Sequence, residues 1–171
     1  MVKITGIIII ITAFSLTGFA YAGNITGRIN QLHELKRITI MLEGELRYSH
    51  STMEETLRTI AQKGDCFSAF FNAVALKLAE NMGESFSEIW RDCVDDFFKN
   101  TKLTDEDAAE FKMLSDSLGY LDMKAQCDSI LLYRERLSAK LEELDSQAAG
   151  KVKMYRSLGV SMGILTAVIL L

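Results

Sequence analysis

Three cysteines and two histidines are the residues of this 171-residue chain best suited to bind a metal ion: Cys66, Cys93, Cys127, His33 and His50. Structural zinc sites use closely spaced ligand pairs, with two to four residues between cysteines or three to five between histidines. No pair here has that spacing, and an odd number of scattered cysteines does not form a disulfide framework. Each cysteine is expected to pack as a small buried hydrophobic residue in a helix, and each histidine to be solvated or capping. The sequence therefore predicts no metal and no cofactor.

Acidic runs are the other groups that could do chemistry, and they occur at Glu54-Glu55, Asp95-Asp96 and Asp105-Glu106-Asp107. The last run falls at a predicted helix start, where carboxylates offset the positive end of the helix dipole. No phosphate loop or nucleophile elbow accompanies these runs. A net charge of -4 with 25% charged residues is ordinary and does not favour nucleic acid as a partner. We therefore expect a protein that is not an enzyme.

The elements that would position these residues are six predicted helices. The chain contains no proline, which favours long helices, and the first helix runs from Asn24 to about Ser49 with apolar residues at helical spacing. Further starts are predicted at Ser51-Thr-Met-Glu54, Asp65, Ser85-Phe-Ser-Glu88, Thr104-Asp-Glu-Asp107 and Asp122, and stops at Gly64, Gly83, Asn100 and Gly119. The aromatic residues between Phe67 and Phe98 are expected to form a core. Short connections predict an all-α fold, a six-helix antiparallel bundle over residues 24–156.

Two uncharged apolar stretches flank the predicted bundle. The first, Ile4–Ala22, has nineteen residues, enough to cross a hydrocarbon core about 30 Å thick. The second, residues 157–171, has fifteen, which is short for a membrane span. An alternative stays open for the first stretch. Lys3 and the pattern Ala20-Tyr21-Ala22 also fit a signal peptide with its cleavage site.

Cations beside the two apolar stretches favour a cytosolic location for the predicted bundle. Six of them lie on its side of the stretches: Arg28, Lys36, Arg37, Lys151, Lys153 and Arg156. Only Lys3 lies beyond the first stretch, so the positive-inside rule places residues 23–156 in the cytosol. The six cations would also form a collar that contacts anionic lipid headgroups at the membrane surface.

Small residues suggest that the two apolar stretches pack together. Gly159 and Gly163 have the GxxxG spacing that lets helix backbones approach closely in lipid. The first stretch offers Ser15, Gly18 and Ala22 in return. These residues predict an intramolecular membrane hairpin, although composition alone would also account for the glycines.

A candidate contact surface follows from the alternating directions of the helices, which bring three helix connections to the end far from the membrane. The residues expected at this tip, called here the tip surface, are Glu43, Glu45, Tyr48, Gly119, Asp122 and Gln126. Gly44 lies inside the first helix, at a cost of about 1 kcal/mol relative to alanine. Either something approaches closely at this glycine or the helix tolerates it, and ordinary helix-end chemistry is the alternative interpretation of the whole surface.

Four stretches of the chain resemble the stage III sporulation protein AB family of endospore-forming bacteria. They are Leu42-Glu43-x-Glu45-Leu46-x-Tyr48, Ser51-Thr52-Met53-Glu54-Glu55, Leu118-Gly119-x-x-Asp122-x-x-x-Gln126 and Tyr155-x-Ser157-Leu158-Gly159-Val160-x-x-Gly163. The last stretch is the most specific, and the resemblance runs over nearly the whole chain. One departure is that Ser51-Thr52-Met53 stands where the family often has Thr-Pro-Leu.

The resemblance implies a non-enzymatic part of a channel complex between mother cell and forespore, in the mother-cell membrane around the forespore. It further implies similarity to the cytosolic helical domains of platform proteins in type II secretion and type IV pilus machines. The expected partners are other proteins of the complex, one of which is similar to secretion ATPases, and an oligomer is possible. A membrane-anchored helical sensor is the alternative, but it needs a bundle outside the cell and an output module inside, and neither is predicted.

Overall fold

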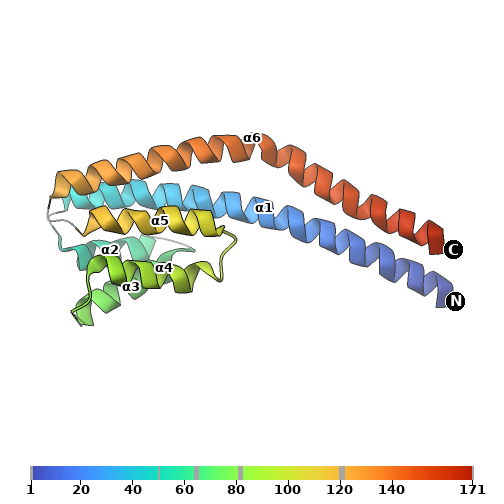
Figure 1. Ribbon diagram of the computed structural model, residues 1–171, viewed down its shortest axis with the longest axis horizontal. Helices are drawn as coiled ribbons and strands as arrows, with labels where there is room; N and C mark the ends of the chain where they lie inside the picture. Colours follow the sequence, from blue (N-terminus) through green and yellow to red (C-terminus); the bar gives the residue numbers. More distant parts are fainter. Residues whose placement is uncertain (1, 50, 64–65, 81–82, 120–121, 171) are drawn as a thin grey trace. The chain divides into compact units, whose positions relative to one another are not determined.

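The computed structural model describes residues 2–49, 51–63, 66–80, 83–119 and 122–170 of the chain. Six helices are present, and no described residue is in a strand, which confirms the all-α prediction (Figure 1). They are α1 (Val2–Tyr48), α2 (Met53–Lys63), α3 (Ser68–Glu80), α4 (Phe86–Phe98), α5 (Asp105–Leu118) and α6 (Met123–Leu170).

The chain divides into two compact units. The terminal unit comprises Met1–Ile29 and Glu142–Leu171, and the core unit comprises Asn30–Leu141. The core unit is shorter than the predicted bundle of residues 24–156, since the remaining residues of that range belong to the terminal unit. Helices α1 and α6 each run without interruption from one unit into the other.

The helix starts in the core unit follow the capping chemistry of the sequence, with one correction. Ser85 with Glu88 and Thr104 with Asp107 form the predicted capping boxes of α4 and α5. At α2, however, the capping residue is Thr52 rather than Ser51. The Glu55 amide donates to Thr52 Oγ1 at 3.2 Å, and the Thr52 amide donates to Glu55 at 3.1 Å. The predicted stop at Gly64 and start at Asp65 lie outside the described residues.

An aromatic cluster fills the core unit, as the sequence predicts. Trp90 of α4 is fully buried, and its ring lies 4.9 Å from those of Phe70 in α3 and Phe111 in α5. The indole Nε1 donates a hydrogen bond of 3.1 Å to the Phe111 carbonyl, which satisfies the polar atom of this buried ring. The cluster therefore joins three helices through one side chain.

The prediction that all three cysteines are buried is wrong for one of them. Cys93 and Cys127 are buried, but Cys66 is exposed. Cys66 lies in the turn before α3 rather than in the helix, and the next residue, Phe67, takes the fully buried position. The periodicity that turns a helical residue toward the core therefore does not apply at Cys66.

Candidate functional site

Two glycines let α1 and α6 pack backbone to backbone in the terminal unit. A Cβ atom added to Gly18 would lie 2.7 Å from the Tyr155 carbonyl oxygen, and one added to Gly159 would lie 2.9 Å from that of Phe14. Gly163 is similarly close to α1, with 3.1 Å to the Cα of Ile11. Residues earlier in α1 contact residues later in α6, so the two segments are antiparallel. Both glycines of the predicted GxxxG pair therefore contact α1.

Aromatic and cationic side chains lie at one end of this glycine contact. The rings of Tyr21 and Tyr155 stack with 5.8 Å between their centroids. On another face, the Arg156 guanidinium lies 5.6 Å from the centre of the Phe19 ring, which is a cation–π arrangement. Tyrosine and arginine are typical of the boundary between hydrocarbon and water, since each combines an apolar body with a polar end.

Large apolar side chains point outward from the terminal unit. Ile9, Leu16 and Val168 are each at least 65% exposed. Among the described residues, α1 contains a segment within Ile9–Tyr48 that is long and apolar enough to cross a membrane, and little of it is buried. The core helix of a soluble protein would be largely buried, so the exposed apolar surface favours a lipid environment.

The six cations of the predicted collar do not lie in one unit. Arg28, Lys151, Lys153 and Arg156 belong to the terminal unit, and Lys36 and Arg37 belong to the core unit. Arg37 pairs with Glu34 and also donates to the Lys63 carbonyl at 3.0 Å, which joins α1 to the end of α2. The Arg37 side chain thus has a structural partner within the core unit.

At the tip surface, the Glu43 carboxylate forms salt bridges with two arginines. Its Oε1 accepts from Arg47 one turn along α1 and its Oε2 accepts from Arg134 of α6, each at 2.7 Å. A hydrogen bond with Cys127 of α6, together with the negative charge of Glu43, raises the pKa of Arg47. These contacts join the end of α1 to the beginning of α6.

Near Glu43 in α1, Glu45 is paired within the chain, whereas Tyr48 and Gly44 are open to solvent or empty space. Glu45 accepts from Lys63 Nζ at 2.9 Å, so it joins α1 to α2. Tyr48, at the end of α1, is 79% exposed. A Cβ added to Gly44 would meet nothing within 4 Å, so no described part of this chain makes the close approach that would explain a glycine there.

The other three residues of the tip surface lie where α5 ends and α6 begins. Gly119 is the residue after the last turn of α5, and its amide donates to the Ser115 carbonyl. Asp122 accepts from the Lys124 amide at 3.0 Å and so caps α6, while Gln126 Nε2 donates to the Leu118 carbonyl at 2.9 Å. Within the core unit, these helix ends and the end of α1 lie on the same side, as alternation predicts (Figure 1).

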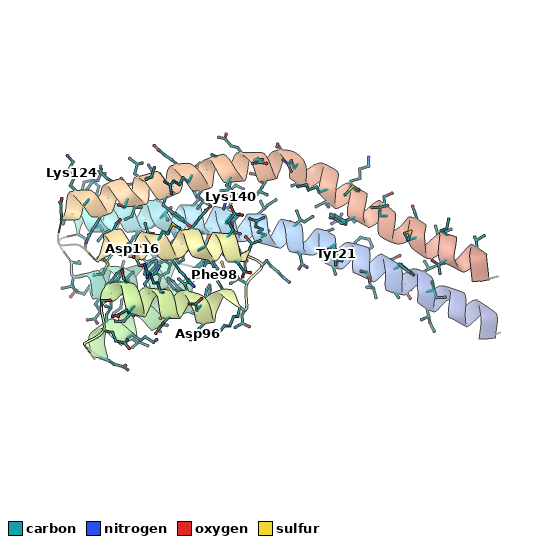
Figure 2. All side chains as sticks on the ribbon, viewed as in Figure 1. Tyr21, Asp96, Phe98, Asp116, Lys124 and Lys140 are labelled. Atoms are coloured by element: carbon teal, nitrogen blue, oxygen red, sulfur yellow. The ribbon has the colours of Figure 1, made fainter. Side chains whose placement is uncertain are left out.

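A charged cluster that no sequence motif predicts joins α6 to the start of α5. Lys140 Nζ lies 2.8 Å from Glu110 and 3.2 Å from Asp107, which is buried (Figure 2 labels Lys140). Partial burial would lower the pKa of Lys140, but the hydrogen bonds that its ammonium donates to Glu110 and Asp107, with their negative charges, outweigh burial and raise that pKa. The sequence signals only the capping role of Asp107, because Lys140 is remote along the chain.

The structure thus defines a class of all-helical proteins that have two paired apolar terminal segments and a separate helical unit with a charged and aromatic core. The family model for Stage III sporulation protein AB matches residues 3–171, and the chain belongs to this family. Stage III sporulation protein AB of Bacillus subtilis (strain 168) is 27% identical over 172 residues, covering 100% of both chains.

A solved structure of Stage III sporulation protein AB (SpoIIIAB) has the same fold. It superposes with a TM-score of 0.65 at 21% sequence identity, over 71% of this chain and 96% of that one. The family is named for sporulation and not for a catalytic activity.

Proposed function

We propose that this protein is a membrane-anchored, non-catalytic component of the channel complex that joins mother cell and forespore during endospore formation. In this proposal, α1 and α6 enter the mother-cell membrane around the forespore, and the core unit is a six-helix antiparallel bundle in the cytosol. The bundle links the membrane channel to cytosolic partners, including the secretion-like ATPase of the complex. Membership of the sporulation family supports the biological setting.

One observation carries the anchoring part of the proposal, which is the glycine contact between α1 and α6. Gly18 and Gly159 bring the two helices together through their backbones and leave large apolar side chains outside. In water this arrangement would expose the apolar surface, whereas in lipid close backbone packing is a main source of helix association. The short second segment would then cross beside the first rather than alone.

The linking role rests on Tyr48 of the tip surface and on Gly44, which lies beside that surface in α1. The side chains of Glu43, Glu45, Asp122 and Gln126 already have partners within the chain. Tyr48 projects into solvent, and Gly44 leaves open space one turn before it. Tyrosine is enriched among residues that dominate binding at interfaces, so Tyr48 is the residue of this surface best placed to contact a partner.

The test is to replace Tyr48 by alanine in sporulating cells that carry the variant as their only copy. We expect spore counts to fall at least tenfold while the amount of membrane-bound protein stays unchanged. Met113→Ala is the matched control, since Met113 is another large exposed apolar residue, on α5. Glu45→Lys is less informative, because it would place a lysine beside Lys63 and disturb the fold. Normal spore counts with Tyr48→Ala would contradict the linking role.

A further inference from the structure

A groove of about 190 Å³ runs along the terminal unit between α1 and α6. Gly18 and Gly159 lie at its base, because their contact draws the two helices together. Phe14, Thr17 and Tyr21 form the α1 wall. Their spacing along α1 places all three on one side of Gly18.

The α6 wall consists of Tyr155, Leu158 and Met162. Leu158 is 51% exposed and Met162 is 49% exposed, so the apolar wall is open to the surroundings. The stacked rings of Tyr21 and Tyr155 close one end of the groove, and side chains without polar groups, such as Met162, line the other. The groove lining is apolar, and the tyrosine pair marks its end nearer Lys151.

Lys151 lies on the same face of α6 as the groove wall, one turn before Tyr155. Lys151 precedes Tyr155 by four residues, Leu158 by seven and Met162 by eleven, which is the spacing of one helix face. Lys151 is exposed, and no ion pair involves it among the residues that the structure describes. Lys153 lies about 3 Å further along the same helix but about 200° around it, on a different face from the groove.

We propose that this groove binds one anionic phospholipid of the surrounding membrane. An acyl chain lies between the walls, the tyrosine pair stands at the level of the glycerol backbone, and the phosphate interacts with Lys151. Tyrosine and lysine suit this boundary, since both favour the membrane interface and lysine attracts anionic headgroups. A partner helix does not fit a groove of this volume, because a helix with its side chains is about 10 Å wide. The inference rests on the proposed membrane anchoring.

The test compares phospholipid retention by the full-length protein, released from detergent micelles in a native mass spectrometer. Phosphatidylglycerol and phosphatidylcholine with the same acyl chains are added in equal amounts. The unaltered protein is expected to retain one phosphatidylglycerol in preference to phosphatidylcholine. Lys151→Gln should weaken this retention by roughly fivefold, the value of one lysine near an anionic surface. Lys153→Gln removes the same charge at nearly the same depth and should leave the retention unchanged.

A second pair of variants tests the acyl-chain site without altering charge. Thr17→Phe places a large ring in the α1 wall, so it should abolish the preferred adduct. Thr12→Phe makes the same change about 140° around α1, outside the groove lining, and should retain it. Both threonines are exposed, and each hydroxyl donates to a carbonyl of α1, from Thr12 to Ile9 and from Thr17 to Ala13, each at 2.9 Å.

The outcomes separate this inference from the proposed function. Equal retention of the two lipids, or equal loss with Lys151→Gln and Lys153→Gln, would overturn the lipid site. Insertion is measured independently, by the resistance of each variant to alkaline extraction from membranes. A chain that extracts completely would contradict both the anchoring and the lipid site, whereas an inserted chain without lipid preference would contradict the lipid site alone.

Discussion

Glu43 is a charged residue of the kind found at contact surfaces, but its carboxylate is already paired with two arginines of the same chain. Its side chain is only 14% exposed and lies between Arg47 and Arg134. A carboxylate can accept about four hydrogen bonds, but this one is largely buried between two cations, so little of it is accessible to a partner protein. Glu43 therefore stabilises the junction of α1 and α6, and a partner would meet Tyr48 first.

Replacement of Glu43 by glutamine is expected to destabilise the core unit by about 1–2 kcal/mol, through the weakened bond to the partly buried Arg134. Glu54→Gln is the matched control. Glu54 pairs with Arg58 on an exposed surface of α2, where such pairs contribute less than about 1 kcal/mol. Urea unfolding of the detergent-solubilised protein, followed by circular dichroism, measures both variants. Equal unfolding midpoints for the two would show that the Glu43 pairs contribute no more than a surface pair.

Residue types and local spacing were enough to predict the caps at Ser85 and Thr104. They were not enough at α2, because Ser51 with Glu54 and Thr52 with Glu55 fit the same capping pattern. Only the packed position of the helix selects Thr52. The Glu45–Lys63 pair was beyond prediction for a related reason, since it depends on how α1 and α2 pack and not on any local motif.

At the scale of elements, the two long helices are the most predictable part of the structure and their contact the least. Continuous apolar and periodic stretches indicate α1 and α6 directly, and the glycine spacing indicates which face of α6 could approach another helix. The spacing of Ser15, Gly18 and Ala22 indicates the partner face on α1, but the residue of closest approach could not be assigned, because all three are small. The structure selects Gly18 for the closest approach and also buries Ala22.

Leucine at position 159 should separate α1 from α6 in the terminal unit, because its Cβ alone would lie 2.9 Å from the Phe14 carbonyl oxygen. A disulfide between cysteines placed at Tyr21 and Tyr155, in a chain without its native cysteines, reports the pairing. We expect its yield to fall about tenfold with Gly159→Leu. Gly150→Leu is the control on the same helix, since a Cβ there meets nothing within 4 Å. Equal yields in the two variants would argue against the backbone contact.

For the molecule as a whole, the exposed Cys66 offers a native reporter of membrane topology. Cys93 and Cys127 are buried, so a bulky thiol reagent should modify the folded protein at Cys66. The cytosolic placement of the core unit and the signal-peptide alternative therefore make opposite predictions for this residue.

In intact cells, a membrane-impermeant maleimide is expected to leave Cys66 unmodified, because the core unit would face the cytosol. Permeabilised cells should give near-complete labelling, and Cys66→Ser should remove it. Modification of Cys66 in intact cells, together with a chain shortened at Ala22, would instead support the signal-peptide interpretation. Protein gels with a fluorescent maleimide distinguish the two results.

The antiparallel contact of α1 and α6 within the terminal unit imposes a matching rule on the two segments that make it. Phe14 and Gly18 are four residues apart in α1, and Gly159 and Tyr155, whose backbones they approach, are four residues apart in α6. An insertion or deletion of one residue between these points in one helix would rotate one contact by about 100° while leaving the other in place. Relatives that lengthen or shorten this part of α1 should therefore carry an equal change in the facing part of α6, so that the two segments vary in length together.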